Sequence, residues 1–301
     1  MSLKNWYIKQ QLKANKDNLS KLSILDRRKQ FEINMGNLAN PHKVITNDVL
    51  INNDTIKGRF ISQTDVKKGP IVLYLHGGGF CMGTLDSYQN PCSDIVSSTK
   101  IKVFLPEYRL APENPFPSPL FDCVKAYDYL VDLGYDPKKI VLMGDSAGAN
   151  LVLSTMLILK KRNAKLPCCS VLLSPCTMVE MYEDNNIYED MEKKDVLLSA
   201  KILRLWAQAY RSKYHPKDPF VSPIYANLTD LPPMFISIGT DDMLLDSARL
   251  FHMRALDYGV DSTFLVNEGC FHAHHLLHYY IPEAKVSMKL ITKFINKQLT
   301  L

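Results

Sequence analysis

Short apolar runs alternate with longer segments of helical spacing along most of this chain. Residues 71–75, for example, form a continuous apolar run, which is typical of a strand buried on both faces of a parallel sheet. The pattern predicts strands at residues 44–51, 56–62, 71–75, 101–105, 140–143, 169–173, 234–238 and 263–266, and helices at 119–133, 147–161, 196–210, 245–258 and 283–298. From the third strand onward, helices lie between most of the strands. We therefore expect an α/β protein with a mostly parallel sheet of roughly eight strands, covered by helices on both faces.

Two stretches fall outside this alternation. Residues 1–40 have a helical pattern, and residues 178–215 begin polar and acidic before they become helical. Neither stretch supplies a strand, so both must lie on top of the sheet or beside it. We therefore predict a helical cap, made of residues 1–40 and an insertion at about 178–215, on a main domain of residues 41–301.

The composition is that of an ordinary soluble globular protein. Apolar residues make up 46% and charged residues 22% of the 301 residues, and the net charge is +5. The basic residues are too diffuse for a nucleic-acid-binding surface, which needs clustered Lys and Arg with aromatic residues among them. The densest basic stretch, Lys4–Lys29, fits the solvated face of amphipathic helices better than a segment that binds membranes or polyanions. We expect no nucleic-acid partner and no stable membrane association, while the oligomeric state stays open and includes a homo-oligomer.

The cysteines and the N-terminal segment bear on the cellular compartment. Seven cysteines stand at no regular spacing, and no CxxC pair suggests a zinc site. The segment that begins the sequence lacks the apolar core of a secretory signal. Reduced thiols are the simplest account of an odd number of cysteines without an export signal. We therefore expect a cytoplasmic protein.

One pentapeptide, Gly144-Asp145-Ser146-Ala147-Gly148, combines a chemical motif with a predicted strand–turn–helix. It fits the pattern G-x-S-x-G between the strand at 140–143 and the helix at 147–161. A sharp turn there projects the serine hydroxyl, and the glycines leave room for the crowded backbone. The helix N-terminus directs N–H groups toward a developing negative charge. These features predict that Ser146 is a nucleophile rather than an ordinary helix cap.

A glycine-rich segment, His76-Gly77-Gly78-Gly79-Phe80, follows the predicted strand at 71–75. Successive glycines allow backbone amides to turn toward a ligand, which suits an oxyanion hole formed together with the amide of Ala147. We expect His76 to orient this loop rather than to transfer protons.

A serine nucleophile needs an acid and an imidazole base, expected in the chain order serine, acid, histidine. Three acids follow the strand at 234–238 and four histidines follow the strand at 263–266, namely Asp241, Asp242, Asp246, His272, His274, His275 and His278. The carboxyl ends of parallel strands meet at one edge of a sheet, so these side chains can converge on Ser146. The residues alone leave open which acid and which histidine act.

Two other interpretations of the histidine-rich segment are weaker. His274 and His278 could share a helix face, but only Glu268 and Cys270 stand nearby to complete a set of metal ligands. Cys270 and His272 could form a nucleophilic pair, but Cys270, unlike Ser146, does not stand at a predicted strand–turn–helix that directs N–H groups toward an oxyanion. We therefore expect no metal site here, and packed or exposed positions for three of the four histidines.

Together these motifs resemble the hormone-sensitive-lipase family of α/β-hydrolase esterases. The resemblance extends from about residue 71 to the C-terminus and rests on segments in the family's order, namely His76–Gly79, Glu107–Glu113 with Phe116-Pro117, Gly144–Gly148, Asp218–Pro223, Asp242–Asp246 and Glu268-x-x-x-His272. It implies an α/β-hydrolase fold with a helical cap. Three positions depart from the family pattern: Ala149 stands for a common glycine, Met243 for the proline of the acid motif, and Ala273-His274 for Gly-Phe. We expect these departures to affect the shape of the pocket and not the reaction.

By this resemblance Ser146, Asp242 and His272 form a catalytic triad. The oxyanion hole consists of residues 77–79 and Ala147, with Gly78, Gly79 and Ala147 as donors and Gly77 shaping the loop. The implied activity is that of a serine carboxylesterase, which hydrolyses short- to medium-chain carboxylic esters through an acyl-enzyme and needs no cofactor or metal.

Two alternatives stay open at this point. A small-amide hydrolase of the formamidase kind would use the same fold and the same site residues. A non-catalytic ligand receptor on this fold would have lost the histidine, so the presence of His272 argues against it.

Overall fold

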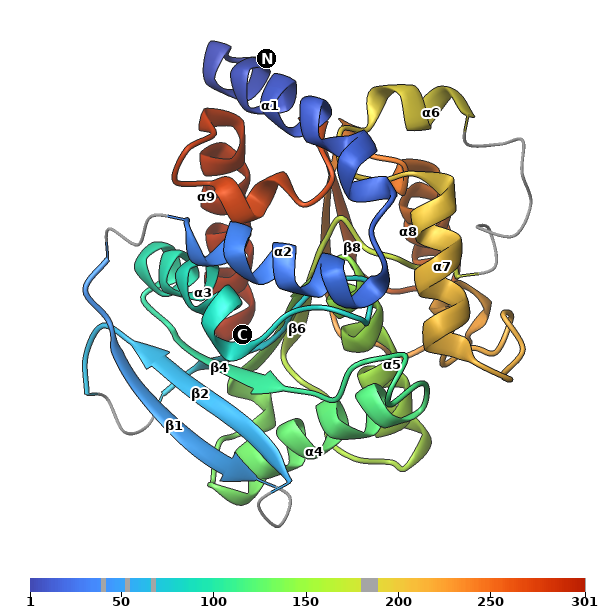
Figure 1. Cartoon of the computed structure of the whole chain (residues 1–301). Coiled ribbons are helices and arrows are strands. Elements are labelled where there is room, and N and C mark those ends of the chain that lie inside the picture. The colour runs from blue at the N-terminus through green and yellow to red at the C-terminus, as the bar shows by residue number, and fades with distance from the viewer. Residues whose placement is uncertain (39–41, 52–54, 66–68, 180–188, 301) are drawn as a thin grey trace.

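One eight-stranded sheet runs through the computed structural model, which describes all residues except 39–41, 52–54, 66–68, 180–188 and 301 (Figure 1). Its spatial order is β1-β2-β4-β3-β5-β6-β7-β8. The strands are β1 (Ile45–Ile51), β2 (Ile56–Ser62), β3 (Ile71–Leu75), β4 (Lys102–Glu107), β5 (Ile140–Asp145), β6 (Cys169–Leu173), β7 (Met234–Asp241) and β8 (Ser262–Phe271). Strand β2 pairs antiparallel with β1 and β4. The other neighbours in this order, β4-β3-β5-β6-β7-β8, all pair in parallel. This confirms the predicted α/β fold.

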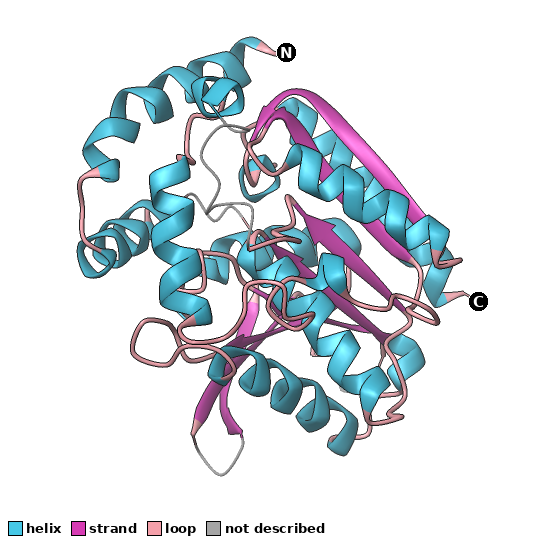
Figure 2. Cartoon of the chain, turned by 90° about the vertical axis from the view of Figure 1, so that its right-hand side faces the viewer, coloured by secondary structure: helices cyan, strands magenta, loops and turns pink. Residues whose placement is uncertain are grey.

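Helices cover both faces of the sheet (Figure 2). They are α1 (Leu3–Ser20), α2 (Ile24–Gly36), α3 (Leu85–Thr99), α4 (Ser118–Asp132), α5 (Ala147–Lys161), α6 (Glu189–Lys194), α7 (Ala200–Arg211), α8 (Leu245–Asp257) and α9 (Pro282–Leu299). Among the described residues, no helix is both long enough and apolar enough to cross a bilayer.

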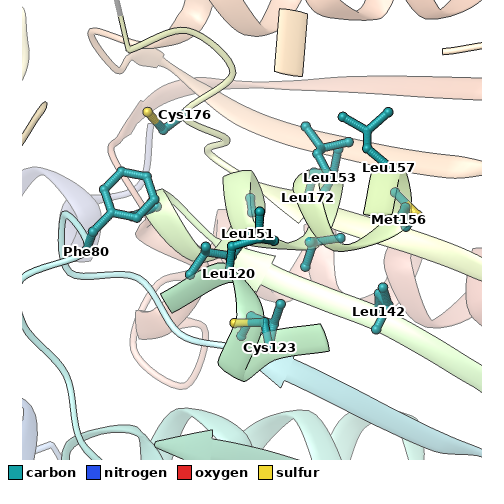
Figure 3. Packing of buried hydrophobic residues seen from close by; sticks show 14 of the residues in the cluster. Phe80, Leu120, Cys123, Leu142, Leu151, Leu153, Met156, Leu157, Leu172 and Cys176 are labelled. Carbon is teal, nitrogen blue, oxygen red and sulfur yellow. The ribbon is translucent and has the colours of Figure 1, made fainter. Parts of the chain in front are cut away.

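Side chains of the central strands alternate between two hydrophobic cores. Leu142 and Leu172 belong to the core that also contains residues of α4, α5 and α8, and Figure 3 shows them packed with α5 side chains such as Leu153. Val141 and Val171 point to the other face, where residues of α3 and α9 pack. All five side chains are fully buried, and each contributes about 1.5–3 kcal/mol relative to an exposed position. Burial on both faces explains the continuous apolar runs in the sequence.

The helix α3 is absent from the sequence-based prediction. It carries Pro91 in its interior and several polar residues, which hide its helical pattern. Its N-terminus is nevertheless well capped, because Thr84 and Ser87 form a reciprocal capping box. Packing of its apolar side against the sheet then outweighs the unfavourable proline.

Strand β8 is longer than the predicted strand at 263–266. Asn267, Glu268 and Gly269 interrupt the apolar pattern, yet β8 continues to Phe271 alongside β7, with an irregularity in the register. Phe271 pairs with Asp241 at the end of β7. The residues that follow the two strands therefore emerge side by side at the same edge of the sheet.

The N-terminal helices contact both the main domain and the segment that carries α6 and α7. Arg28 of α2 donates hydrogen bonds to the carbonyl oxygens of Cys81 (2.7 Å) and Ala111 (3.0 Å). Lys16 of α1 donates to the carbonyl oxygens of Glu192 (2.7 Å) and Asp195 (2.6 Å). Figures 1 and 2 show these helices on the same side of the molecule as α7. Residues 180–188 of the predicted insertion lie outside the described residues.

Candidate active site

Ser146 occupies a sharp turn between β5 and α5. Its backbone has a φ of +53°, which is a strained value for a residue with a side chain. The Ser146 N–H donates to the carbonyl oxygen of Leu173 (2.8 Å) and helps to hold this conformation. The flanking glycines are required by packing, because a Cβ on Gly144 or Gly148 would stand 2.6 or 2.0 Å from the carbonyl oxygen of Leu75. The end of β3 thus lies against the turn and leaves room for glycine alone.

Asp242 and His272 follow β7 and β8 and lie next to this serine. The His272 Nε2 atom is 2.9 Å from Ser146 Oγ. On the other side of the ring, His272 Nδ1 is 3.1 and 3.0 Å from the two carboxylate oxygens of Asp242. The structure therefore brings Ser146, His272 and Asp242 into one continuous chain of hydrogen bonds, although 96 residues separate the serine from the acid (242 − 146 = 96).

The environment of the pair favours an ionised Asp242 and a proton-accepting His272. Asp242 is fully buried and His272 is 5% exposed. Burial opposes the charge on Asp242, but the facing His272 and the N–H of Leu244 (2.9 Å) lower its pKa below the ordinary value. Burial also opposes the charged imidazole, but the Asp242 carboxylate outweighs burial and raises the pKa of His272 above 6.5. The site can thus stabilise an imidazolium that forms when the serine loses its proton.

A loop with unused amides approaches the serine from β3. Gly78, Gly79 and Phe80 all have positive φ values, of +107°, +62° and +62°. Among the described residues, none accepts a hydrogen bond from the N–H of Gly78, Gly79 or Ala147. By contrast, the N–H of Gly77 donates to other groups of the protein and is occupied. The N–H of Gly77 is therefore not available to a ligand, whereas the other three amides have no acceptor in the part of the chain that the structure describes.

Asp145 anchors this loop, a role that our sequence analysis did not identify. Its buried carboxylate accepts hydrogen bonds from the hydroxyls of Tyr74 (2.8 Å) and Tyr88 (3.0 Å) and from the N–H of Gly77 (2.9 Å). Burial raises the pKa of Asp145, and these donors act in the opposite direction. The sequence offered one indication of this role, the position of Asp145 beside Ser146 in the motif. The contacts with Tyr74 and Tyr88 could not be predicted, because both tyrosines are distant in sequence.

Helix α7 packs two aromatic residues against the same loop. The indole of Trp206 covers Gly79 so closely that a Cβ there would stand 2.4 Å from the ring. Tyr210, one turn further along α7, stacks on Phe80 with ring centroids 3.6 Å apart and an interplanar angle of 7°. This contact buries Phe80 and supports its unusual backbone conformation.

The four other histidines that the sequence analysis considered are packed in the interior, and no hydrogen bond joins them to Ser146. His76 stacks on Tyr108 (4.1 Å between centroids), and burial lowers the pKa of His76 to about 4. His274, His275 and His278 are also buried, and burial lowers the pKa of each. Within the described residues, no group of three His, Cys, Asp or Glu side chains is arranged to hold a metal ion.

The other acids and the cysteine of this region face elsewhere. Asp241 forms an ion pair with Lys9 of α1, and Asp246 and Glu268 are exposed. Cys270 is buried and accepts a hydrogen bond from Asn5, and burial raises its pKa to about 12. A thiol with so high a pKa is a poor nucleophile at neutral pH.

The chain is similar to known hydrolases over most of its length. Residues 72–276 match a family described as having the alpha/beta hydrolase fold. An acetyl-hydrolase of Streptomyces hygroscopicus is 32% identical over 76% of this chain and 76% of its own length. An esterase of Acinetobacter venetianus is 31% identical over 74% of each chain.

Solved structures show the same likeness over the whole chain. An esterase of the bacterial hormone-sensitive-lipase family superposes with a TM-score of 0.91, at 29% identity and 99% coverage of both chains. An esterase/lipase from an uncultured bacterium superposes with a TM-score of 0.90, at 26% identity and 100% coverage of both chains.

Proposed function

Because this chain belongs to the hormone-sensitive-lipase family of alpha/beta hydrolases, we propose that it is a serine carboxylesterase that acts on short- to medium-chain esters. The observation that carries this proposal is the chain of hydrogen bonds from Ser146 through His272 to Asp242, next to three free amides. Relatives named acetyl-hydrolase and esterase support the same class of reaction.

The proposed mechanism is acyl transfer through an acyl-enzyme. Ser146 attacks the ester carbonyl while His272 accepts the hydroxyl proton and then gives it to the leaving alcohol. Water attacks the acyl-enzyme in the second half of the cycle, with His272 again as base. Asp242 holds the imidazole tautomer and stabilises its cation, and the N–H groups of Gly78, Gly79 and Ala147 stabilise the tetrahedral oxyanion.

We also propose that the N-terminal helices and the segment that carries α6 and α7 form a cap over this site, on a catalytic domain of residues 41–301. Two contacts support the proposal. Lys16 of α1 binds the backbone of Asp195 between α6 and α7, and Trp206 of α7 packs on Gly79 of the oxyanion loop. A cap of this kind excludes water from the reacting groups and limits the size of the acyl chain.

Short acyl chains are expected to be the best substrates. The aromatic residues of α7 crowd the oxyanion loop, and the exposed residues of the proposed cap are mainly charged and polar. Each methylene group buried in an acyl tunnel would contribute about 0.8 kcal/mol of binding. A long tunnel would therefore raise kcat/KM steadily with acyl-chain length, whereas a short pocket would not. The kcat/KM of p-nitrophenyl acetate, butyrate, octanoate and palmitate, measured below their micelle concentrations, should peak at the short chains and then fall. A maximum at palmitate, or activation at a lipid interface, would indicate a true lipase.

The rival activity, hydrolysis of small amides, is tested with matched substrates. An ester and an anilide with the same acyl group differ only in the leaving group, so they sample the same acyl pocket. We expect turnover of p-nitrophenyl butyrate to exceed turnover of p-nitrobutyranilide by at least about 10³-fold, because p-nitrophenolate leaves as a stable anion, whereas the anilide nitrogen must take a proton from His272 as it leaves. Comparable turnover of the two would favour an amide hydrolase, and no turnover of either would favour a ligand receptor.

A further inference from the structure

Asp195 is a buried carboxylate with no part in the mechanism above. It lies between α6 and α7 and is 2% exposed. One carboxylate oxygen accepts the N–H groups of Leu197 (2.8 Å) and Leu198 (2.9 Å). The other accepts the N–H of Met243 (2.9 Å), the residue that follows Asp242. Asp195 thus joins the segment between α6 and α7 to the loop that carries the proposed catalytic acid.

This contact needs a backbone N–H at position 243. Met243 supplies it, whereas a proline at this position would have no N–H to donate. A carboxylate also needs several donors to remain buried in its charged form, and Met243 supplies one of three.

We propose that Asp195 is a positioning residue, which holds the Asp242 loop through the Met243 amide and adds a second negative charge near the His272 imidazole. The proposal rests on the esterase function argued above. In this proposal the charge of Asp195 raises the pKa of His272, and its hydrogen bond to Met243 fixes the position of the Asp242 loop.

The charges around Asp195 agree with this role. Ionisable side chains near it come from several elements, namely Lys16 of α1, Glu192 of α6, Asp242 after β7 and His272 after β8. Burial and the charge of Asp242 raise the pKa of Asp195 to about 6, so it remains mainly ionised at pH 7 and above. Its charge acts on His272 together with those of Asp242 and Asp145, and each raises the pKa of the imidazole.

The pH dependence of kcat/KM tests the charge of Asp195. The acidic limb of this profile reports the His272 imidazole in the free enzyme, which must be neutral to accept the serine proton. Asp195→Asn removes a negative charge, so the pKa of His272 should fall and the limb should move to lower pH by about half a unit or more. The same charge stabilises the imidazolium of the transition state, so kcat at pH 8 should fall roughly three- to tenfold with KM within about twofold.

Two controls separate this effect from a merely structural one. The concentration of active enzyme is determined by titration with a fluorophosphonate, so that kcat is calculated only for molecules whose serine reacts. Asp241→Asn also removes one negative charge, but from the residue before Asp242, whose carboxylate is paired with Lys9. This variant should leave the acidic limb of the pH profile at its wild-type position. An Asp195→Asn enzyme with the wild-type limb and kcat would overturn the proposal, and so would a limb that moves to higher pH.

The hydrogen bond is tested separately with Met243→Pro, which removes the N–H. Asp195 then loses a donor and becomes harder to ionise, so the limb should again move to lower pH. Met243→Leu keeps the N–H and should leave the acidic limb at its wild-type position. The double variant should have the same acidic limb as Asp195→Asn alone, because the Met243 N–H acts on the imidazole through the charge of Asp195, which that variant already lacks. Additive shifts of the limb would overturn the role of the bond, whereas absence of any ester turnover in the wild type would instead overturn the proposed function.

Discussion

Replacement of Ser146 by alanine should lower kcat for p-nitrophenyl butyrate by about 10⁶-fold, as removal of the nucleophile does in other serine hydrolases. Alanine leaves His272 and the oxyanion amides in place but supplies no atom to bond the acyl carbon. The substitution should be tolerated by the fold, because alanine keeps the Cβ and leaves the strain of the turn unchanged while it removes only the hydroxyl. Steady-state kinetics measure the loss, and mass spectrometry after fluorophosphonate treatment locates the label.

Ser154 of α5 provides a matched control. It is also a buried serine of this helix, but its hydroxyl donates to the carbonyl oxygen of Phe220 and lies outside the proposed machinery. Ser154→Ala should keep kcat within a few-fold of the wild type and should still be labelled on Ser146. A label on another residue while Ser146 stays unmodified would refute Ser146 as the nucleophile.

Asp242→Asn should cost roughly 10⁴-fold in kcat, because an amide favours the wrong tautomer of the His272 imidazole and leaves its cation unstabilised. His272→Ala should be at least as damaging, since it removes the base itself. Both effects should appear in kcat with little change in KM, because ground-state binding of the ester does not depend on the proton transfer. The pH profile of residual activity gives a second readout, since the limb that reports His272 should disappear in His272→Ala.

The crowded sequence around these residues supplies the controls. Asp241→Asn changes the neighbouring acid, which pairs with Lys9, and His274→Ala changes a histidine whose Nδ1 atom lies 3.0 Å from the carbonyl oxygen of Phe271. We expect both variants to keep most of their activity, with some loss of stability for the buried histidine. Near-normal activity of His272→Ala together with an inactive His274→Ala would show that the acting histidine is His274.

Much of the fold follows from local patterns. The strands at 56–62, 71–75 and 169–173 and the helix at 147–161 have the predicted bounds, because continuous apolar runs and helical periodicity report burial directly. Helix α3 escaped prediction because its proline and polar residues mask the pattern, and tertiary packing decided its structure. The end of β8 was missed because Asn267, Glu268 and Gly269 interrupt the apolar pattern, although Asn267 and Phe271 pair with β7.

The sequence by itself determined the α/β fold and the position of Ser146 between a strand and a helix, because both depend on patterns of residues that are close along the chain. It presented several acids and histidines that could complete the site, and their spacing could not rank them. The resemblance to the family pointed to Asp242 and His272, but their position beside Ser146 is a result of the tertiary structure, since the pairing of β7 with β8 is a non-local contact. The same holds for Asp195 and Asp145, whose importance depends on donors from distant segments. A buried carboxylate is defined by what surrounds it, and that is settled only when the chain has folded.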